Sequence, residues 1–255
     1  MPLIRFFAIL VISACLPWAS LATEPAGEKP SRKESAPATE KPATEKPAPE
    51  KPAVDKNAKE WRPLFDGKTL KGWKVSEFYG VGKVEIVDGV IIMKPGVDMT
   101  GITATQKMPK VNYEIQLEAQ RVEGTDFFCG ITFPIKEDFC SLIIGGWGGG
   151  VVGLSSLNGM DASENETTTF RDFKNGQWYP IKLRVTANRV TAWIGDEEEI
   201  NVDIAESTIS TRIEVEWSKP FGIATWNTTG AIRNLKIRDL SDQEVKRIEA
   251  EKINR

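Results

Sequence analysis

The sequence has no histidine among its 255 residues. Ser-His-Asp triads, Cys-His pairs, His-x-Glu deaminase sites and histidine-rich zinc sites are therefore excluded, because each requires an imidazole. Only three cysteines are present and none forms a Cys-x-x-Cys motif, which excludes a four-cysteine zinc site. An excess of basic residues is missing as well: 33 basic and 36 acidic side chains give a net charge of −3. We therefore expect no nucleic-acid partner.

The chain also lacks an apolar run long enough to span a membrane. The run Phe6–Leu16 follows the basic Arg5, is shorter than the ~20 residues of a span, and is interrupted by Pro17. The small residues Ser20 and Ala22 then stand on either side of Leu21, as at the cleavage site of an export signal. The pattern predicts an export signal over residues 1–22 and a periplasmic or extracellular protein. A variant remains open, because the residues before Cys15 resemble a lipobox: lipidation of Cys15 would make a lipoprotein and supply its membrane attachment.

Residues 23–60 differ in composition from the rest of the chain. They contain seven prolines, eight basic and eight acidic residues and no aromatic residue, and the pentapeptide 39–43 recurs with small changes at 44–48 and 49–53. Such a segment cannot bury enough apolar surface to fold, and its prolines favour an extended conformation. We expect a disordered spacer, either an inert linker or a tether that holds the following domain away from a membrane or wall.

From residue 61 to 240 short β-type segments follow one another. In Tyr113–Gln120 apolar and polar residues alternate, as in a half-buried strand. Tight turns are expected at Asp88-Gly89, Ala187-Asn188 and Gly195-Asp196. About a dozen strands and no long helical period predict an all-β, two-sheet antiparallel sandwich. The expected strands are 83–87, 90–94, 102–106, 113–121, 127–133, 140–145, 151–155, 178–186, 189–194, 200–204, 221–226 and 231–240.

The last segment, 241–255, begins with Ser241-Asp-Gln-Glu244, the pattern of a helix capping box. We expect a short C-terminal helix or a frayed tail without a function of its own.

One segment of the sandwich region resembles a known family. Leu64-Phe-Asp-Gly-Lys-Thr-Leu-Lys-Gly-Trp73 is similar to the opening of the 3-keto-disaccharide hydrolase-like family, formerly a domain of unknown function. Weaker similarities follow along the region 61–240, at 112–117, 175–179, 189–194, 221–223 and 232–235. The resemblance implies a concanavalin A-like jelly roll of the lectin and glucanase type, with a carbohydrate as the partner.

The resemblance also implies an activity, the hydrolysis of 3-keto-disaccharides and other 3-keto glycosides. A base would remove the proton on sugar carbon 2, the group on carbon 1 would be eliminated, and water would add. Active members of the family use a histidine and a bound cation, and this sequence has no histidine. Whether the chain is an enzyme thus stays open; the alternative is a non-catalytic glycan-binding or structural module on a spacer.

Trp147 is the first candidate for a sugar contact, because five glycines surround it between residues 145 and 150. Glycine weakens a strand unless a backbone or a ligand approaches closely, and an exposed indole stacks well on the apolar face of a sugar ring. The alternative is a bend in the sheet with Trp147 in the core.

Acidic and amide side chains then crowd into a short stretch, residues 161–166. Glu164 and Glu166 are candidates for a catalytic base and acid, Asn165 for sugar binding and Asp161 for a ligand of a divalent cation. The alternative is an exposed polar loop. The Glu-x-Asp-x-x-Glu motif of jelly-roll glucanases is absent, which argues against a conventional retaining glycosidase.

Three further candidates come from strand ends. Asp126 precedes a buried-type strand and is a candidate catalytic base, or else a solvated turn residue. Arg171 follows the acidic stretch and is a candidate for pairing with it or with a sugar hydroxyl, the alternative being a surface arginine. Asn227 is a candidate sugar ligand beside Trp226, which we expect in the core.

Cys129 and Cys140 are the cysteines that remain after removal of the signal. In an exported protein they are either a disulfide or two buried thiols. A disulfide requires a hairpin turn centred near Pro134-Ile135.

Overall fold

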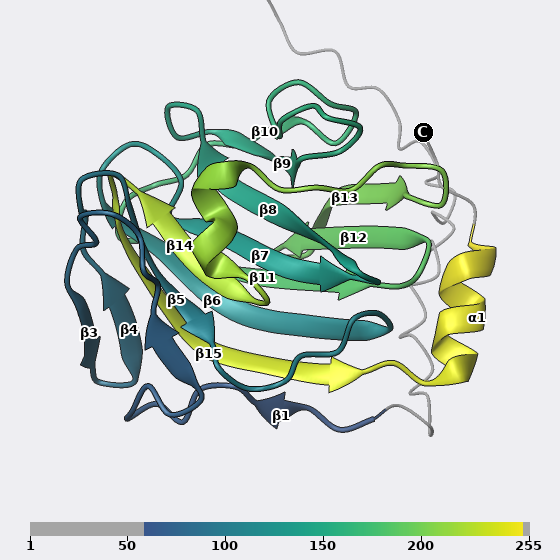
Figure 1. The fold of residues 1–255 in the computed structure, drawn as a ribbon, viewed down its shortest axis with the longest axis horizontal. Coiled ribbons are helices and arrows are strands. Elements are labelled where there is room, and N and C mark those ends of the chain that lie inside the picture. The colour runs from purple at the N-terminus through teal and green to yellow at the C-terminus, as the bar shows by residue number, and fades with distance from the viewer. Residues whose placement is uncertain (1–58, 252–255) are drawn as a thin grey trace, which may run out of the picture. The chain divides into compact units, whose positions relative to one another are not determined.

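The computed structural model describes residues 59–251. The predicted export signal, Cys15 and the spacer up to residue 58 lie outside the described residues. The described chain forms strands, one short 3₁₀ helix and one α-helix (Figure 1). The strands are β1 (Arg62–Pro63), β2 (Trp73–Val75), β3 (Val84–Val87), β4 (Val90–Met93), β5 (Met99–Ala104), β6 (Tyr113–Glu123), β7 (Cys129–Ile135), β8 (Asp138–Gly146), β9 (Val151–Ser155), β10 (Thr169–Phe170), β11 (Trp178–Val185), β12 (Arg189–Ile194), β13 (Glu197–Asp203), β14 (Gly222–Trp226) and β15 (Thr229–Asp239).

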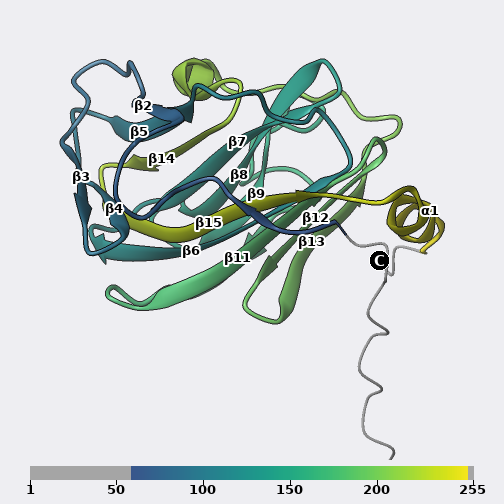
Figure 2. The ribbon, with the colours of Figure 1, turned by 90° about the horizontal axis from the view of Figure 1, so that it is seen from below.

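The strands form two antiparallel sheets. Sheet A has the order β13-β12-β11-β6-β15-β4-β3, with β1 paired to β15, and sheet B has the order β10-β9-β8-β7-β14-β5-β2. Figure 2 shows sheet B lying over sheet A. The 3₁₀ helix η1 (Ile213–Ser218) lies on the far side of sheet B, and the α-helix α1 (Asp242–Ala250) lies beyond the end of β15. The expected two-sheet sandwich is confirmed.

The alternation predicted for the longest strand, β6, is present. Tyr113, Ile115 and Leu117 are buried in the core between the sheets, and the residues between them face outward. Tyr113 also donates a hydrogen bond from its hydroxyl to the carbonyl of Pro134, 2.7 Å away. Its polar end is thus satisfied inside the core, as burial of a tyrosine requires.

One outward residue of β6 is buried despite its charge. The carboxylate of Glu114 accepts hydrogen bonds from Arg184 and from Arg238, both at 2.7 Å. Arg238 also donates to Glu244 at 2.7 Å, which attaches α1 to the sheet. Ser241 caps α1 and forms the expected capping box with Glu244.

Among residues 59–251, no helix combines the length and apolar character that crossing a membrane requires.

All twelve expected strands are present within a few residues of their predicted limits. The three predicted turns join β3 to β4, β11 to β12, and β12 to β13. The sequence reading missed β1, β2, β10 and η1. Three of these are strands of two or three residues, too short to display a period of two.

The decapeptide that carries the family resemblance folds into a turn packed against the core. The carboxylate of Asp66 accepts hydrogen bonds from the backbone of Lys68 and of Thr69 and from the Thr69 hydroxyl, each at 2.7 Å. These bonds, the strongest from the Thr69 hydroxyl, lower the pKa of Asp66 to about 2. The indole of Trp73 donates to the carbonyl of Leu64 at 2.7 Å and closes the segment. Its residues therefore identify the fold rather than a ligand site.

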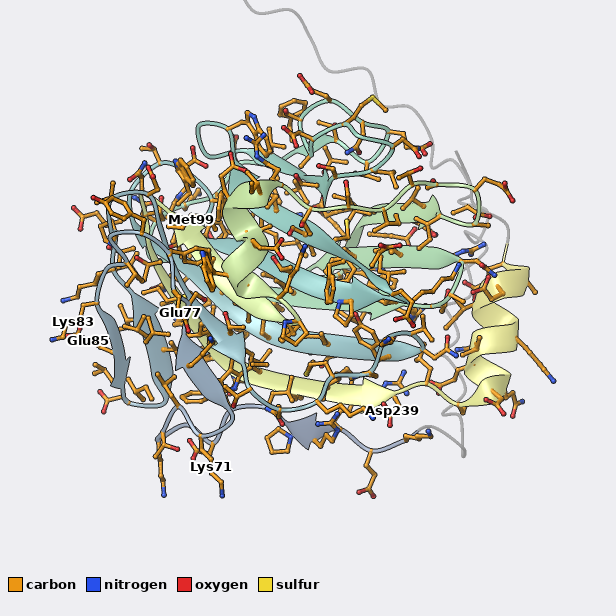
Figure 3. All side chains as sticks on the ribbon, viewed as in Figure 1. Lys71, Glu77, Lys83, Glu85, Met99 and Asp239 are labelled. Atoms are coloured by element: carbon orange, nitrogen blue, oxygen red, sulfur yellow. The ribbon has the colours of Figure 1, made fainter. Side chains whose placement is uncertain are left out.

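The edge strand β3 carries charged side chains. Lys83, just before the strand, forms an ion pair with Glu85 on it (Figure 3), and Lys94 pairs with Glu85 at 3.2 Å. Charges on an edge strand discourage pairing with a second chain.

Cys129 and Cys140 are buried as free thiols, so the disulfide alternative is excluded. The β7–β8 hairpin turns between Ile135 and Asp138, two residues later than a disulfide would need. Cys140 consequently lies opposite Phe133, and Cys129 lies opposite Ile144.

Candidate functional site

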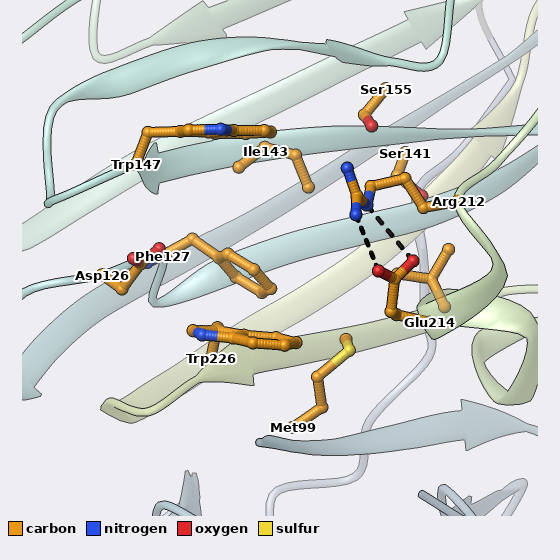
Figure 4. A pocket seen from close by; sticks show the side chains of 11 residues that line it. Met99, Asp126, Phe127, Ser141, Ile143, Trp147, Ser155, Arg212, Glu214 and Trp226 are labelled. Carbon is orange, nitrogen blue, oxygen red and sulfur yellow. Dashed lines mark hydrogen bonds and ion pairs between the residues drawn. The ribbon is translucent and has the colours of Figure 1, made fainter. Parts of the chain in front are cut away.

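The outer face of sheet B carries a pocket of about 220 Å³ (Figure 4). Its floor is formed by small or aliphatic side chains of the central strands, Ser141 and Ile143 from β8 and Ser155 from β9. Loops beyond the strand ends and the beginning of η1 form its walls. The full lining is Met99, Asp126, Phe127, Ser141, Ile143, Trp147, Ser155, Arg212, Glu214, Val215 and Trp226.

Aromatic rings form much of the wall. Figure 4 shows the indoles of Trp147 and Trp226 on opposite sides of the pocket, with the ring of Phe127 between them at one end. The rings of Phe127 and Trp226 are 6.4 Å apart at their centroids. Trp147 is 46% exposed, an unusual state for so large an apolar side chain. The arrangement presents flat apolar surfaces to whatever occupies the pocket.

The glycines around Trp147 shape the backbone that presents it. A bulge interrupts the β8–β9 pairing between Ile144 and Gly146. Gly145 and Gly149 both have positive φ angles, and a Cβ on Gly145 would lie 2.9 Å from the ring of Phe128. Trp147 itself has a φ of 48°, which is uncommon for a bulky residue. The bend expected from the glycines is therefore present, but Trp147 lines the pocket and is not in the core.

Trp226 is held in place by its neighbour. Its indole N–H donates to the side-chain oxygen of Asn227, and the Asn227 amide donates to the carbonyl of Val97, both at 3.1 Å. Asn227 does not line the pocket itself. The structure therefore gives Asn227 a positioning role behind Trp226, and it places Trp226 at the pocket instead of wholly in the core.

An ion-pair network forms the wall facing Phe127. Arg212 donates to Glu214 through Nη2 at 2.7 Å and through Nε at 3.2 Å, and it also pairs with Asp161. Asp161 accepts hydrogen bonds from the hydroxyls of Ser155 and Ser156, both at 3.3 Å. The bonds from Arg212 hold the pKa of Glu214 below its ordinary value, and those to Glu214 and Asp161 raise the pKa of Arg212. Arg212 and Glu214 are therefore both charged at neutral pH.

Asp126 lies at the other end of the pocket (Figure 4). One carboxylate oxygen accepts from the backbone N–H of Phe127 at 2.7 Å and the other from that of Gly148 at 3.4 Å. Across residues 59–251 no lysine or arginine forms an ion pair with it. Asp126 is thus the carboxylate of this pocket without a cationic partner.

The acidic stretch does not form a site as a unit. Asn165 is buried, and its amide donates to the carbonyls of Leu154, Met160 and Asp161 at 2.6 to 3.1 Å. Its oxygen accepts from the backbone and the hydroxyl of Thr167. Asn165 thus organises the loop, while the next two candidates, Glu164 and Glu166, are exposed and absent from the pocket lining.

Arg171 is likewise outside the pocket. It pairs with Glu199 at 2.6 Å and with Glu197, both on β13. The bond links the segment after β10 to the edge of the other sheet. Neither the acidic stretch nor a pocket-bound ligand is its partner here.

The cation suggested by the family resemblance has no matching set of donors. Among the described residues no three Asp, Glu or Cys side chains gather as they would around a metal ion. Asp161, the proposed metal ligand, is instead neutralised by Arg212. We therefore assign no chemical step to a metal at this pocket.

Sequence reasoning found Asp126 and Trp147 but missed Arg212, Glu214 and Met99. The segment 205–214 has no periodic pattern that would have drawn attention to it. Its bridge between Leu157 and Ile209 is the contact that brings Arg212 to the pocket.

A second hollow of about 630 Å³ lies on the outer face of sheet A. Polar side chains such as Gln116, Lys182 and Lys236 line it, and none of the candidate catalytic, sugar-binding or metal-binding residues does. The pocket on sheet B is the stronger candidate because it combines exposed rings with charged groups.

Solved structures share the sandwich. A beta-glucanase from Bacillus licheniformis is 9% identical, with 73% of this chain and 100% of that chain covered and a TM-score of 0.50. A candidate glycosyl hydrolase from Parabacteroides distasonis is 16% identical, with coverages of 71% and 94% and a TM-score of 0.48. A carbohydrate-binding module from Bacillus subtilis is 11% identical, with coverages of 66% and 96% and a TM-score of 0.46. The glucanase likeness confirms the jelly-roll fold. No curated protein matches this sequence.

The sequence was also compared with models of protein families. The model of the 3-keto-alpha-glucoside-1,2-lyase-like domain matches residues 60–238, which is nearly the whole sandwich. The resemblance seen in the opening decapeptide is thereby confirmed, and this chain belongs to the 3-keto-alpha-glucoside-1,2-lyase-like domain family.

Proposed function

We propose that the chain is an exported protein that binds a sugar ring in the pocket on sheet B and cleaves 3-keto glycosides there. The observation that carries the proposal is the combination of an exposed indole, a guanidinium and a carboxylate without a cationic partner around one pocket. Flat apolar walls suit the C–H face of a pyranose. The charged groups at the two ends suit a reaction that moves a proton and develops a negative charge.

Asp126 is the base in this proposal. A ketone at carbon 3 makes the hydrogen on carbon 2 acidic, and Asp126 would remove that proton to leave an enolate. Glu214 is not assigned as the base, because Arg212 holds its carboxylate through two hydrogen bonds and lowers its pKa. The exposed Glu164 and Glu166 lie outside the pocket and drop out of this role.

Arg212 stabilises the enolate. Its guanidinium has five N–H groups, of which three hydrogen bonds go to Glu214 and Asp161. The remaining donors are available to the oxygen on carbon 3. The enolate then collapses, a double bond forms between carbons 1 and 2, and the group on carbon 1 leaves and takes a proton from water. The hydroxide that remains adds to carbon 1 and Asp126 returns its proton to carbon 2, which gives the free 3-keto sugar and completes a net hydrolysis.

A second function is favoured by one observation. Each pocket carboxylate already accepts hydrogen bonds from the protein, through backbone N–H groups at Asp126 and through Arg212 at Glu214. A site satisfied in this way suits a module that binds a glycan without changing it. Lack of histidine is consistent with the same function.

Incubation of the purified chain with 3-keto-trehalose and 3-keto-sucrose separates the two functions. Release of hexose that is lost in Asp126→Asn supports the enzyme. Binding of unoxidised sugar in calorimetry, with no release of hexose from the 3-keto sugars even after addition of calcium, manganese or zinc, supports the binding module instead of the enzyme. Trp147→Ala should weaken binding in either case, so retained binding in that variant would remove the pocket from both proposals.

A further inference from the structure

The two most exposed tryptophans of residues 59–251 lie on the same outer face of sheet B. Trp147 is 46% exposed at the pocket, and Trp217 is 51% exposed on η1. Within the part of the chain that the structure describes, neither indole ring contacts another ring or a cation. The other five described tryptophans each have such a contact: Trp61 with Lys236 and Arg238, Trp73 with Phe221, Trp178 with Arg233, Trp193 with Lys182 and Arg184, and Trp226 with Phe127.

The position of Trp217 is fixed by the way η1 lies on the sheet. Val215 packs with Met99 and Ala224 in an apolar cluster beneath the helix. The hydroxyl of Thr103 on β5 donates to the backbone carbonyl of Trp217 at 2.6 Å. Ser218 is fully buried against Gly222, where an added Cβ would lie 2.6 Å from the Ser218 carbonyl. The helix is therefore held firmly, and exposure of the Trp217 ring is not a consequence of a loose segment.

Trp217 lies in the same short helix as two residues of the pocket. Glu214 and Val215, from the first turn of η1, line the pocket. Side chains three residues apart eclipse one another in a 3₁₀ helix, which rises by about 2 Å per residue, so Trp217 lies on the same side of η1 as Glu214 and about 6 Å further along the helix axis. That offset takes a ligand from the pocket onto the next ring-sized area of surface rather than to a separate face.

Polar groups accompany the exposed ring. Lys74 on β2 is paired directly with Thr103 in the sheet, so both side chains face outward beside η1. The Lys74 ammonium pairs with Glu77 at 2.6 Å, and Lys219 pairs with Glu216 at 2.7 Å. An exposed indole bordered by charged hydrogen-bonding groups is suited to a sugar, which has an apolar face and a rim of hydroxyls.

We propose that Trp217 is a second stacking platform, which takes the sugar ring next to the one held in the pocket. The inference rests on the proposed function and deepens it: the group on carbon 1 of the bound sugar is itself a saccharide, and a chain of two or more rings is the preferred ligand. The pocket holds the ring that reacts, and η1 holds its neighbour.

Calorimetric titration with ligands of increasing length tests this proposal. The probes are methyl α-glucoside, maltose and maltotetraose, with methyl β-glucoside, cellobiose and cellotetraose as the second series. We expect at least one series to gain about tenfold in affinity from one ring to two or more. Trp217→Ala should remove that gain and leave the affinity for the methyl glycoside unchanged, while Trp217→Phe should retain most of it.

Phe170→Ala is the matched control, since Phe170 is an exposed aromatic residue, 78% accessible, on the edge strand β10 of the same sheet. Equal affinity for one ring and for several in both series, or an unchanged gain in Trp217→Ala, would overturn the platform. Cleavage of 3-keto-trehalose is measured in parallel. Cleavage without any effect of ligand length rules out the platform and leaves the proposed cleavage activity. A length effect that depends on Trp217, without cleavage, leaves the platform and rules out the cleavage activity.

Discussion

Arg212 binds Glu214 through two of its nitrogens, with Nη2 to Oε1 at 2.7 Å and Nε to Oε2 at 3.2 Å. The geometry fixes the plane of the guanidinium, because both bonds come from one edge of it. Asp161 binds Nη1 from a different loop. The guanidinium is therefore oriented before any ligand enters the pocket.

Arg212→Ala should lower kcat for cleavage of a 3-keto glycoside by about 100-fold, as loss of an oriented donor to a developing oxyanion does. Arg212→Lys should recover little of the loss, because an ammonium cannot reproduce the two-point contact with Glu214. Steady-state kinetics on both variants tests this, with urea unfolding as the check on folding. A kcat within threefold of the wild type in Arg212→Ala would rule out the assigned role.

Asp126→Asn should lower kcat by about 100-fold or more and leave KM nearly unchanged, since the amide keeps the shape of the side chain but cannot accept the proton. Glu164→Gln and Glu166→Gln are the matched controls, because both carboxylates are exposed and outside the pocket. We expect less than a twofold change in each. A larger loss in either control than in Asp126→Asn would return the base to the acidic loop.

Asn165→Ala should destabilise the fold rather than remove a ligand contact. The substitution leaves the carbonyls of Leu154, Met160 and Asp161 without their amide donor. The expected loss is about 2 kcal/mol in the free energy of unfolding, measured in urea. At urea concentrations well below the unfolding midpoint, the affinity for sugar should stay within threefold of the wild-type value. A large loss of affinity without a loss of stability would restore Asn165 as a sugar ligand.

Glu244 should make stability depend on pH. Burial alone would raise its pKa, but hydrogen bonds from Ser241 and Arg238 outweigh burial and hold the pKa below the ordinary 4.5. Since the folded-state pKa is the lower one, the stabilisation is complete above the ordinary value and is lost as pH falls through the folded value. Glu244→Gln should lower the free energy of unfolding by about 1 kcal/mol at pH 7. The difference from the wild type should shrink as pH falls below 4.5; a difference that is constant with pH would contradict the assignment.

Cys129 and Cys140 should be inert in the folded protein. Burial raises the pKa of both thiols, that of Cys140 to about 12, so little thiolate is present at neutral pH. In a Cys15→Ser background we expect no reaction with a chromogenic disulfide reagent until urea is added, and then two thiols per chain. A reducing agent should leave Tm unchanged. A Tm that falls on reduction would indicate a disulfide that the register of β7 and β8 does not permit.

Most of the sandwich could be predicted because its strands are long enough to alternate. The eleven residues of β6 show the period of two over several repeats, whereas β1 and β10 consist of two residues each. The register in which neighbouring strands pair was harder to predict from the sequence. The disulfide question depended on a hairpin register, and a shift of two residues in the turn places the two cysteines opposite other side chains.

The site was predictable only in part for a different reason. Trp147 and Asp126 stand next to a glycine cluster and a strand end, which are local signals. Arg212 reaches the pocket through a contact between loops some fifty residues apart, as its bond to Asp161 demonstrates. The role of Asn165 could not be decided from the sequence, because a buried loop-forming amide and a ligand-binding amide have the same appearance there.

The strands and the loops contribute different parts of the pocket, and this separation affects how the ligand selectivity of the pocket can change. Small or aliphatic side chains of β8 and β9 supply the floor, while loops and η1 supply nearly every charged or aromatic group. Those outer residues take little part in the ladders of either sheet. Exchanging them should change which ligand the pocket takes while the two sheets keep their pairing.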